Sequence, residues 1–184
     1  SLEFSQLSVS QTSYVNFSQA VQQCHLELGS VHHSAVMAGH ACLTEDDREL
    51  GTLLIDFGGG TTSVAIFSEG QLRFAGTIRM GGLNVTRDIA KMLSITISEA
   101  ERLKAIDGSV LPTIISAEHV KSLPFPSQGD NFVLSNIVSA GDHLTLPGGK
   151  VIQRQFLSDI IRTRCEEILE AVDQLLLTNG LGPA

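Results

Sequence analysis

The stretch from residue 52 to residue 80 constrains the fold of this chain more than any other part. An apolar run, TLLID, ends at Asp56 and is followed by the turn FGGGTT and by a second apolar, β-branched run, SVAIF. Glu69-Gly70 is a typical hairpin turn, and residues 71–80 show the partial alternation of a third strand. The sequence therefore predicts an antiparallel meander of three strands, with a glycine-rich turn between the first and the second.

The glycine-rich turn has the chemistry of a phosphate and magnesium site. Because glycines lack Cβ atoms, backbone N–H groups in such a turn can approach an anion closely. An acid such as Asp56 repels a bare phosphate but suits Mg²⁺ or its water shell, which bridges to phosphate oxygens. The turn has neither the Walker nor the dinucleotide-binding pattern, and a glycine-rich hairpin without a ligand remains the alternative. The residues predicted for this phosphate and magnesium site are Asp56, Gly58, Gly59, Gly60, Thr61 and Thr62, with Mg²⁺ held by Asp56 through water.

Periodicity and end signals predict the other elements. Apolar spacing predicts helices over residues 14–28, 83–93, 98–106 and 154–177, with Gly29 as the stop of the first. Short strands are expected over 31–37 and around 113–116, 133–134 and 144–146, and a small-residue helix or turn over 38–43. A full capping box is expected at Ser98 with Glu101. Thr44 with Asp47 resembles one, with a solvated helix turn that leads into the next strand as the alternative.

Composition excludes several classes of protein. Hydrophobic residues make up 42% of the 184 residues and charged residues 17%, which is typical of a globular protein with its own core. No run approaches the ~18–20 apolar residues of a membrane span. The net charge of −8 argues against a nucleic-acid partner and a polybasic lipid-binding segment. The start has no signal-peptide pattern and no Met, so we expect part of a longer protein.

The cysteines and histidines do not suggest a metal site. Cys24, Cys42 and Cys165 are far apart, without zinc or redox spacing, and are expected to be reduced thiols. His32 and His33 are adjacent, so in a strand they would point to opposite faces.

The start of the last helix is basic although the chain is acidic. Residues 150–164 hold four basic residues and one acid, a local net charge of +3, whereas residues 166–173 hold four acids and no base. Charges in this order oppose the helix dipole at both ends, by ~0.3–1 kcal/mol for each charge close to a terminus. Such a patch is a candidate docking site for an acidic peptide, and a solvated helix face is the alternative. Its residues are Lys150, Arg154, Arg162 and Arg164.

Four segments carry a resemblance to a known family. The segments TEDDRELG, LLIDFGGGTTSVAIFSEGQL, GG-x-x-VT-x-DIA and EAERLK-x-x-x-G follow one another over residues 40–110. In order and spacing they resemble the bacterial cell-division FtsA family of the actin-like ATPase superfamily. The resemblance implies an α/β fold with α+β elements: an actin-like (ribonuclease H-like) half-domain with the three-stranded meander, and an attached small α/β subdomain. It assigns residues 1–49 to the end of a 1C-like subdomain and a linker, 50–97 to part of a 2A-like subdomain and 98–184 to a 2B-like subdomain.

The resemblance also implies function. The complete protein is expected to bind ATP and Mg²⁺, and Glu101 and Lys104 to contact adenosine, with an exposed i,i+3 pair as the alternative. The first phosphate hairpin and the later glycine pair of the superfamily are missing, so we expect this chain to bind ATP weakly or not at all and not to catalyse. Whether the complete protein hydrolyses ATP stays open.

The partners that the resemblance implies are proteins and a membrane. The 2B-like part, with the basic residues of the last helix, is expected to receive the C-terminal tail of FtsZ, and the complete protein to self-associate into filaments. Membrane contact is expected only through a C-terminal helix outside this chain, at the cytoplasmic face of the inner membrane at the division site. The alternative is another actin-fold protein: a phosphotransferase, a phosphatase, or a rod-shape or pilus-assembly relative.

Overall fold

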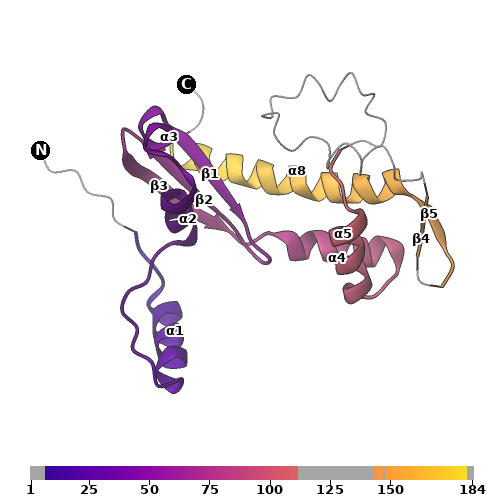
Figure 1. The fold of residues 1–184 in the computed structure, drawn as a ribbon, viewed down its shortest axis with the longest axis horizontal. Helices are drawn as coiled ribbons and strands as arrows, with labels where there is room; N and C mark the ends of the chain where they lie inside the picture. Colours follow the sequence, from indigo (N-terminus) through magenta and orange to yellow (C-terminus); the bar gives the residue numbers. More distant parts are fainter. Residues whose placement is uncertain (1–6, 112–142, 147, 182–184) are drawn as a thin grey trace, which may run out of the picture. The chain divides into compact units, whose positions relative to one another are not determined.

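The computed structural model describes residues 7–111, 143–146 and 148–181 (Figure 1). They belong to two compact units, Ser1–Arg79 and Met80–Ala184, and each is described here by itself. The first unit contains, in order, α1 (Gln11–Gln23), α2 (Ser34–Cys42), α3 (Glu45–Leu50), β1 (Thr52–Phe57), β2 (Thr62–Ser68) and β3 (Gln71–Ile78). The second contains α4 (Gly82–Leu93), α5 (Ile97–Asp107), β4 (His143–Thr145), β5 (Val151–Gln153) and α8 (Arg154–Thr178).

The predicted meander is confirmed. The three strands form an antiparallel sheet in the order β1-β2-β3, and β2 is its most buried strand. Across the sheet Asp56 is paired with Ser63, and Ser63 with Thr77. Directly paired residues point to the same face of a sheet, so these three side chains form one row.

The turn between β2 and β3 also closes the end of α3. Glu69 and Gly70 have φ values of 53° and 69°, and glycine adopts such a left-handed conformation without strain. Their backbone N–H groups donate to the carbonyls of Glu49 (3.1 Å) and Arg48 (3.2 Å) in the last turn of α3. At the other end of α3, the predicted capping box between Thr44 and Asp47 is present.

The strand predicted over residues 31–37 is wrong, because this region leads into α2. Ala35 and Val36 are buried against Ala65 and Phe67 of β2, so the small residues of the helix cover one face of the sheet. A Cβ atom added at Gly39 would lie 2.3 Å from the Phe67 ring. Close packing on the sheet therefore favours a helix here, and α2 extends the helix or turn that was expected over 38–43.

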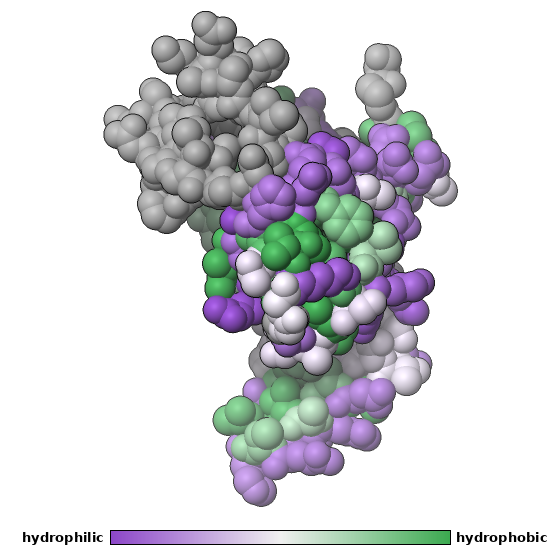
Figure 2. Space-filling view, turned by 90° about the vertical axis from the view of Figure 1, so that its right-hand side faces the viewer, coloured by the Kyte–Doolittle hydropathy of each residue, from purple (hydrophilic) through white to green (hydrophobic). Residues whose placement is uncertain are grey.

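Helix α1 begins and ends earlier than predicted and buries none of its residues. The chain leaves the helix through His25, whose φ is 58°, rather than at Gly29. Tyr14, Val15 and Phe17 are exposed. Figure 2 shows green apolar side chains on this helix, which is the lowest segment of the view.

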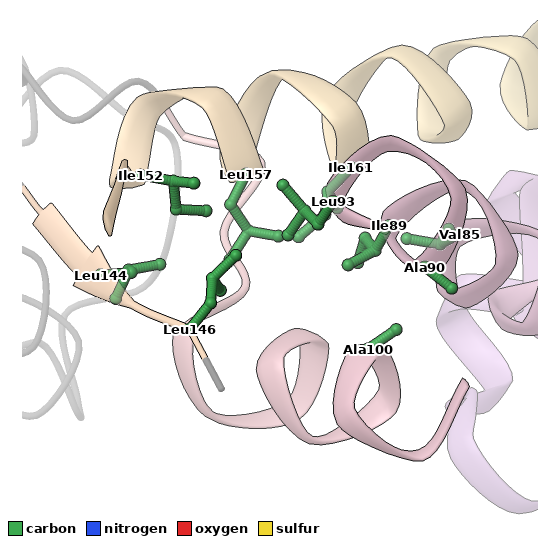
Figure 3. Close-up of a cluster of buried hydrophobic side chains, with 10 residues drawn as sticks. All are labelled: Val85, Ile89, Ala90, Leu93, Ala100, Leu144, Leu146, Ile152, Leu157 and Ile161. Carbon is green, nitrogen blue, oxygen red and sulfur yellow. The ribbon is translucent and has the colours of Figure 1, made fainter. Parts of the chain in front are cut away.

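The second unit is built around one apolar cluster (Figure 3). It combines residues of α4 and α5 with the β4–β5 hairpin and the first half of α8. Leu157 of α8 is fully buried, whereas Met92 of α4 is exposed. The cluster consists of Val85, Ile89, Ala90, Leu93, Ala100, Leu144, Leu146, Ile152, Leu157 and Ile161.

Of two other predictions in this unit, one needs correction and one is confirmed. The N-cap of α5 lies two residues earlier than expected, because Thr96 and Glu99 form the capping box instead of Ser98 and Glu101. The strand expected around 144–146 is β4, which pairs with β5, a strand that the sequence analysis missed. The strands expected around 113–116 and 133–134 lie outside the described residues.

All three cysteines are free thiols. Among the described residues, no helix is long and apolar enough to cross a membrane, and no group of three or more metal-binding side chains is found.

Candidate functional site

The glycine-rich turn is a tight, exposed loop. The N–H of Gly58 donates to the carbonyl of Thr61 (2.9 Å), which closes the turn between β1 and β2. A Cβ atom at Gly58 would lie 2.7 Å from that carbonyl oxygen, so glycine is needed here for the fold itself. A Cβ atom at Gly60 would have no atom within 4 Å. The turn therefore presents exposed backbone at Gly59, Gly60 and Thr61 with open space above Gly60, which fits the approach of a phosphate group.

Asp56 is available to a cation or to its water shell. Its carboxylate is half-buried and forms no hydrogen bond or ion pair with another residue in the described part of the chain. Oxygen ligands of this kind suit Mg²⁺, which keeps several of its waters in proteins. The donor set at the turn thus fits the predicted phosphate and magnesium chemistry, whereas Thr62 is fully buried.

Next to Asp56 lies a group of polar side chains that the sequence analysis did not select. The Ser63 hydroxyl is 3.0 Å from the Thr77 hydroxyl, and Nε2 of His33, at the start of α2, is 3.0 Å from the same Thr77 oxygen. The signal was available, since the register of two hairpins places Ser63 and Thr77 beside Asp56. The contribution of His33 was hidden, because residues 31–37 were expected to be a strand.

Glu101 and Lys104 tie α5 to the start of α4. The Lys104 ammonium group donates to Glu101 (2.8 Å), to the Thr86 hydroxyl (2.9 Å) and to the Gly82 carbonyl (3.2 Å). Glu101 also accepts a hydrogen bond of 2.5 Å from Thr86. The hydrogen bond from Lys104, and then the one from Thr86, lower the pKa of Glu101. Glu101 and Lys104 thus form the i,i+3 ion pair that was the alternative to a nucleotide contact, and in addition they join two helices. Their contact with adenosine stays a prediction.

The three arginines of the predicted docking surface have carboxylate partners within the second unit. Arg164 of α8 binds both carboxylate oxygens of Asp88 in α4, at 2.5 and 3.0 Å, and Glu167 at 2.5 Å. Asp88 is the main cause of the raised pKa of Arg164.

The other two arginines are also paired, and the lysine is not. Arg154 binds Asp107 at 3.0 Å, and Arg162 forms an ion pair with Asp159. Lys150 is exposed, and its ammonium group contacts no acid within the described part of the chain.

The comparison with protein families decides the identity. A family model described as "Cell division protein FtsA" matches residues 53–166, which include β1 apart from Thr52, β2, β3, α4, α5 and the first half of α8. The chain belongs to the FtsA family. The resemblance and the mixed α/β, actin-like fold expected from the sequence are thereby confirmed.

Curated FtsA proteins agree with this assignment. The chain is 32% identical over 177 residues to the cell division protein FtsA of Rhizobium meliloti, a match that covers 96% of this chain and 37% of the relative. It is 32% identical over 162 residues to the Escherichia coli K12 protein, which covers 88% of this chain and 34% of the relative. This FtsA-family chain thus spans about a third of the length of these relatives.

Solved structures share the fold. The crystal structure of MreB5 of Spiroplasma citri bound to ADP matches with a TM-score of 0.63 and 20% identity, over 91% of this chain and 48% of that one. The ethanolamine utilization protein EutJ from Carboxydothermus hydrogenoformans matches with a TM-score of 0.53 and 16% identity, over 93% of this chain and 44% of that one. These likenesses bear on the fold alone.

The predicted nucleotide residues of this FtsA-family chain fall into two groups. Residues 56–62 lie in the first unit, where one hairpin brings them together. Glu101 and Lys104 lie together in the second unit.

Proposed function

We propose that this FtsA-family chain is part of a cell-division actin homologue that binds ATP and Mg²⁺ and links FtsZ to the cytoplasmic face of the inner membrane at the division site. The family match over residues 53–166 carries the proposal, because it includes both the glycine-rich turn and α5. In this proposal, residues 1–49 are 1C-like, 50–97 are 2A-like and 98–184 are 2B-like. Filament formation and membrane contact belong to the complete protein.

The turn supports the nucleotide part of the proposal. The β- and γ-phosphates would meet the backbone N–H groups of Gly59 to Thr61, and Mg²⁺ would be held near Asp56 through water. The open space above Gly60 and the unpartnered carboxylate of Asp56 within the described residues support these roles. Glu101 and Lys104 would face the adenosine. When bound, Mg²⁺ supplies charge neutralisation for the phosphates.

The basic residues before and within α8 support the partner part. An acidic FtsZ tail would meet Lys150, Arg154, Arg162 and Arg164 in the 2B-like part. Because the three arginines already bind carboxylates of this chain, a peptide carboxylate must compete for them or share them. Lys150 has no such competitor among the described residues, so we expect it to make the first ion pair with the peptide.

The partner role is tested by calorimetric titration of this chain with an FtsZ C-terminal peptide. We expect measurable binding that weakens at high salt and that Lys150→Glu reduces about three- to tenfold, the effect of one or two charge contacts. Lys91→Glu makes the same charge change on the exposed side of α4, outside the proposed surface, and should leave the affinity unchanged. No peptide binding, or equal effects of the two variants, would refute this surface.

The nucleotide role is tested with Mg-ATP on two proteins. The complete gene product should bind it, whereas this chain should show negligible affinity, because we expect it to carry only half of the cleft. Gly60→Val should weaken binding by the complete protein without changing its melting temperature, since the added side chain enters open space. Tight binding by this chain alone would contradict the half-cleft proposal.

A further inference from the structure

The row of polar side chains beside Asp56, formed by Ser63, Thr77 and His33, ends at a histidine with one unpartnered ring nitrogen among the described residues. His33 is held in place by its backbone, because its carbonyl accepts hydrogen bonds from Val36 and Met37 in the first turn of α2. Its Nε2 atom meets Thr77, but Nδ1 is buried and has no hydrogen-bond partner among the residues that the structure describes. The row therefore runs from His33 through Thr77 and Ser63 to Asp56.

The unpartnered nitrogen indicates which ring nitrogen carries the proton. A buried N–H group without an acceptor is rarer in proteins than an acceptor without a donor. The neutral ring therefore keeps its proton on Nε2 and donates it to the Thr77 oxygen.

The direction of the remaining hydrogen bonds follows from the charge at the other end of the row. Ser63 and Asp56 are direct partners across β1 and β2, and such partners have Cβ atoms ~4.5–5.5 Å apart. A hydrogen bond to a charged acceptor is roughly twice as strong as a neutral one. The favoured arrangement has Thr77 donating to Ser63. This leaves the Ser63 proton without an acceptor among the described residues, and Asp56 is the direct neighbour of Ser63 across the strands.

We propose that His33 is a positioning residue, which sets the direction of the hydrogen bonds along His33, Thr77 and Ser63 and thereby keeps the Ser63 hydroxyl proton free to reach and orient Asp56. The proposal rests on the proposed function, since the oriented carboxylate is the one that would hold Mg²⁺ through water. It adds three residues to the site, and it couples the position of α2 to the glycine-rich turn.

The first test needs no nucleotide. Imidazole nitrogen shifts of ¹⁵N-histidine in the complete gene product should show His33 with a bare Nδ1 and a protonated Nε2, its signal being assigned by the loss in His33→Gln. A proton on Nδ1 would overturn the proposal.

The second test measures the Mg²⁺ concentration for half-maximal ATP binding by the complete gene product. His33→Phe and Thr77→Val should each raise it about two- to tenfold, the effect of one hydrogen bond. Both residues act through the same row of hydrogen bonds. The Mg²⁺ concentration for half-maximal binding in the double variant should therefore be close to that of the single variants. His33→Gln, whose amide nitrogen reaches a place similar to Nε2, should restore the wild-type value.

A matched control separates positioning from stability. Val36 is buried in α2 and does not belong to the row, so Val36→Ala should lower the melting temperature and leave the Mg²⁺ midpoint unchanged. An equal rise of the midpoint in Val36→Ala, or no rise in His33→Phe, would overturn the proposal alone. Absence of ATP binding by the wild-type protein would instead refute the proposed function, and with it the role of the row.

Discussion

The ion pair between Arg164 and Asp88 is expected to be the strongest polar contact between α4 and α8. The two residues are 76 positions apart, and the guanidinium binds both carboxylate oxygens in the bidentate geometry that is strongest for arginine. Their side chains are 24% and 28% exposed. Asp88→Ala would leave the Arg164 guanidinium partly buried, with Glu167 as its one remaining partner among the described residues.

The size of the effect follows from the burial. Breaking a fully buried pair costs ~3–5 kcal/mol, whereas exposed pairs contribute ~0.2–1 kcal/mol. With about a quarter of each side chain exposed, we expect Asp88→Ala to lower the free energy of unfolding by roughly 2–3 kcal/mol. For a chain of this length each kcal/mol lowers the melting temperature by ~2–4 °C.

The assay is urea unfolding followed by circular dichroism at 222 nm, because the sequence has no Trp. Glu167→Ala is the matched control: it removes another partner of the same guanidinium, but one whose side chain is 53% exposed, so we expect a loss of less than about 0.5 kcal/mol. In a double-mutant cycle, Asp88 and Arg164 should couple by ~1–3 kcal/mol. Equal effects of the two alanine variants, or a coupling energy near zero, would refute the reasoning.

Three further predictions concern single positions in the two units. Gly58→Ala should destabilise the chain by about 1–3 kcal/mol in urea unfolding, because its Cβ would lie 2.7 Å from a backbone carbonyl, whereas Gly60→Ala should have little effect. Leu157→Ala should cost about 3–4 kcal/mol in the same assay, since the side chain is fully buried in the second unit. The pKa of Glu101 is lowered in the folded chain, so its contribution to stability is present above its ordinary pKa near 4.3 and is lost as the pH falls through the lowered value. Acid unfolding of Glu101→Gln, which resembles the protonated residue, should therefore begin at the same pH or higher and be less steep, and an onset at a lower pH or a steeper transition would contradict this.

The sequence was most informative where local chemistry and tertiary structure agree. The meander was predictable because Glu69-Gly70 favours a hairpin and because the strands on both sides are apolar and β-branched. The glycine-rich turn could be selected for the same reason, since Gly58 is required by the turn itself. The helix α8 is long and strongly periodic, and its C-terminal end was predicted to within one residue.

The errors arose where tertiary contacts choose between local alternatives. Two overlapping capping boxes precede α5, and the sequence cannot tell that the carboxylate of Glu101 is bound by Thr86 and Lys104 and is not available for capping. The strand expected before α2 failed because a helix with Gly39 packs closely on Phe67. The polar row was missed because His33 joins it only through that helix.

The turn between β2 and β3 has a practical consequence for labelling. Surface hairpin turns are usual places for inserting an epitope or a fluorescent tag, because loop tips tolerate insertions. Here the N–H groups of Glu69 and Gly70 hold the last carbonyls of α3, and both residues are left-handed. An insertion at this tip would release α3, whose residues lead directly into β1 and the glycine-rich turn. A tag intended to report on the protein without disturbing it therefore belongs away from this hairpin.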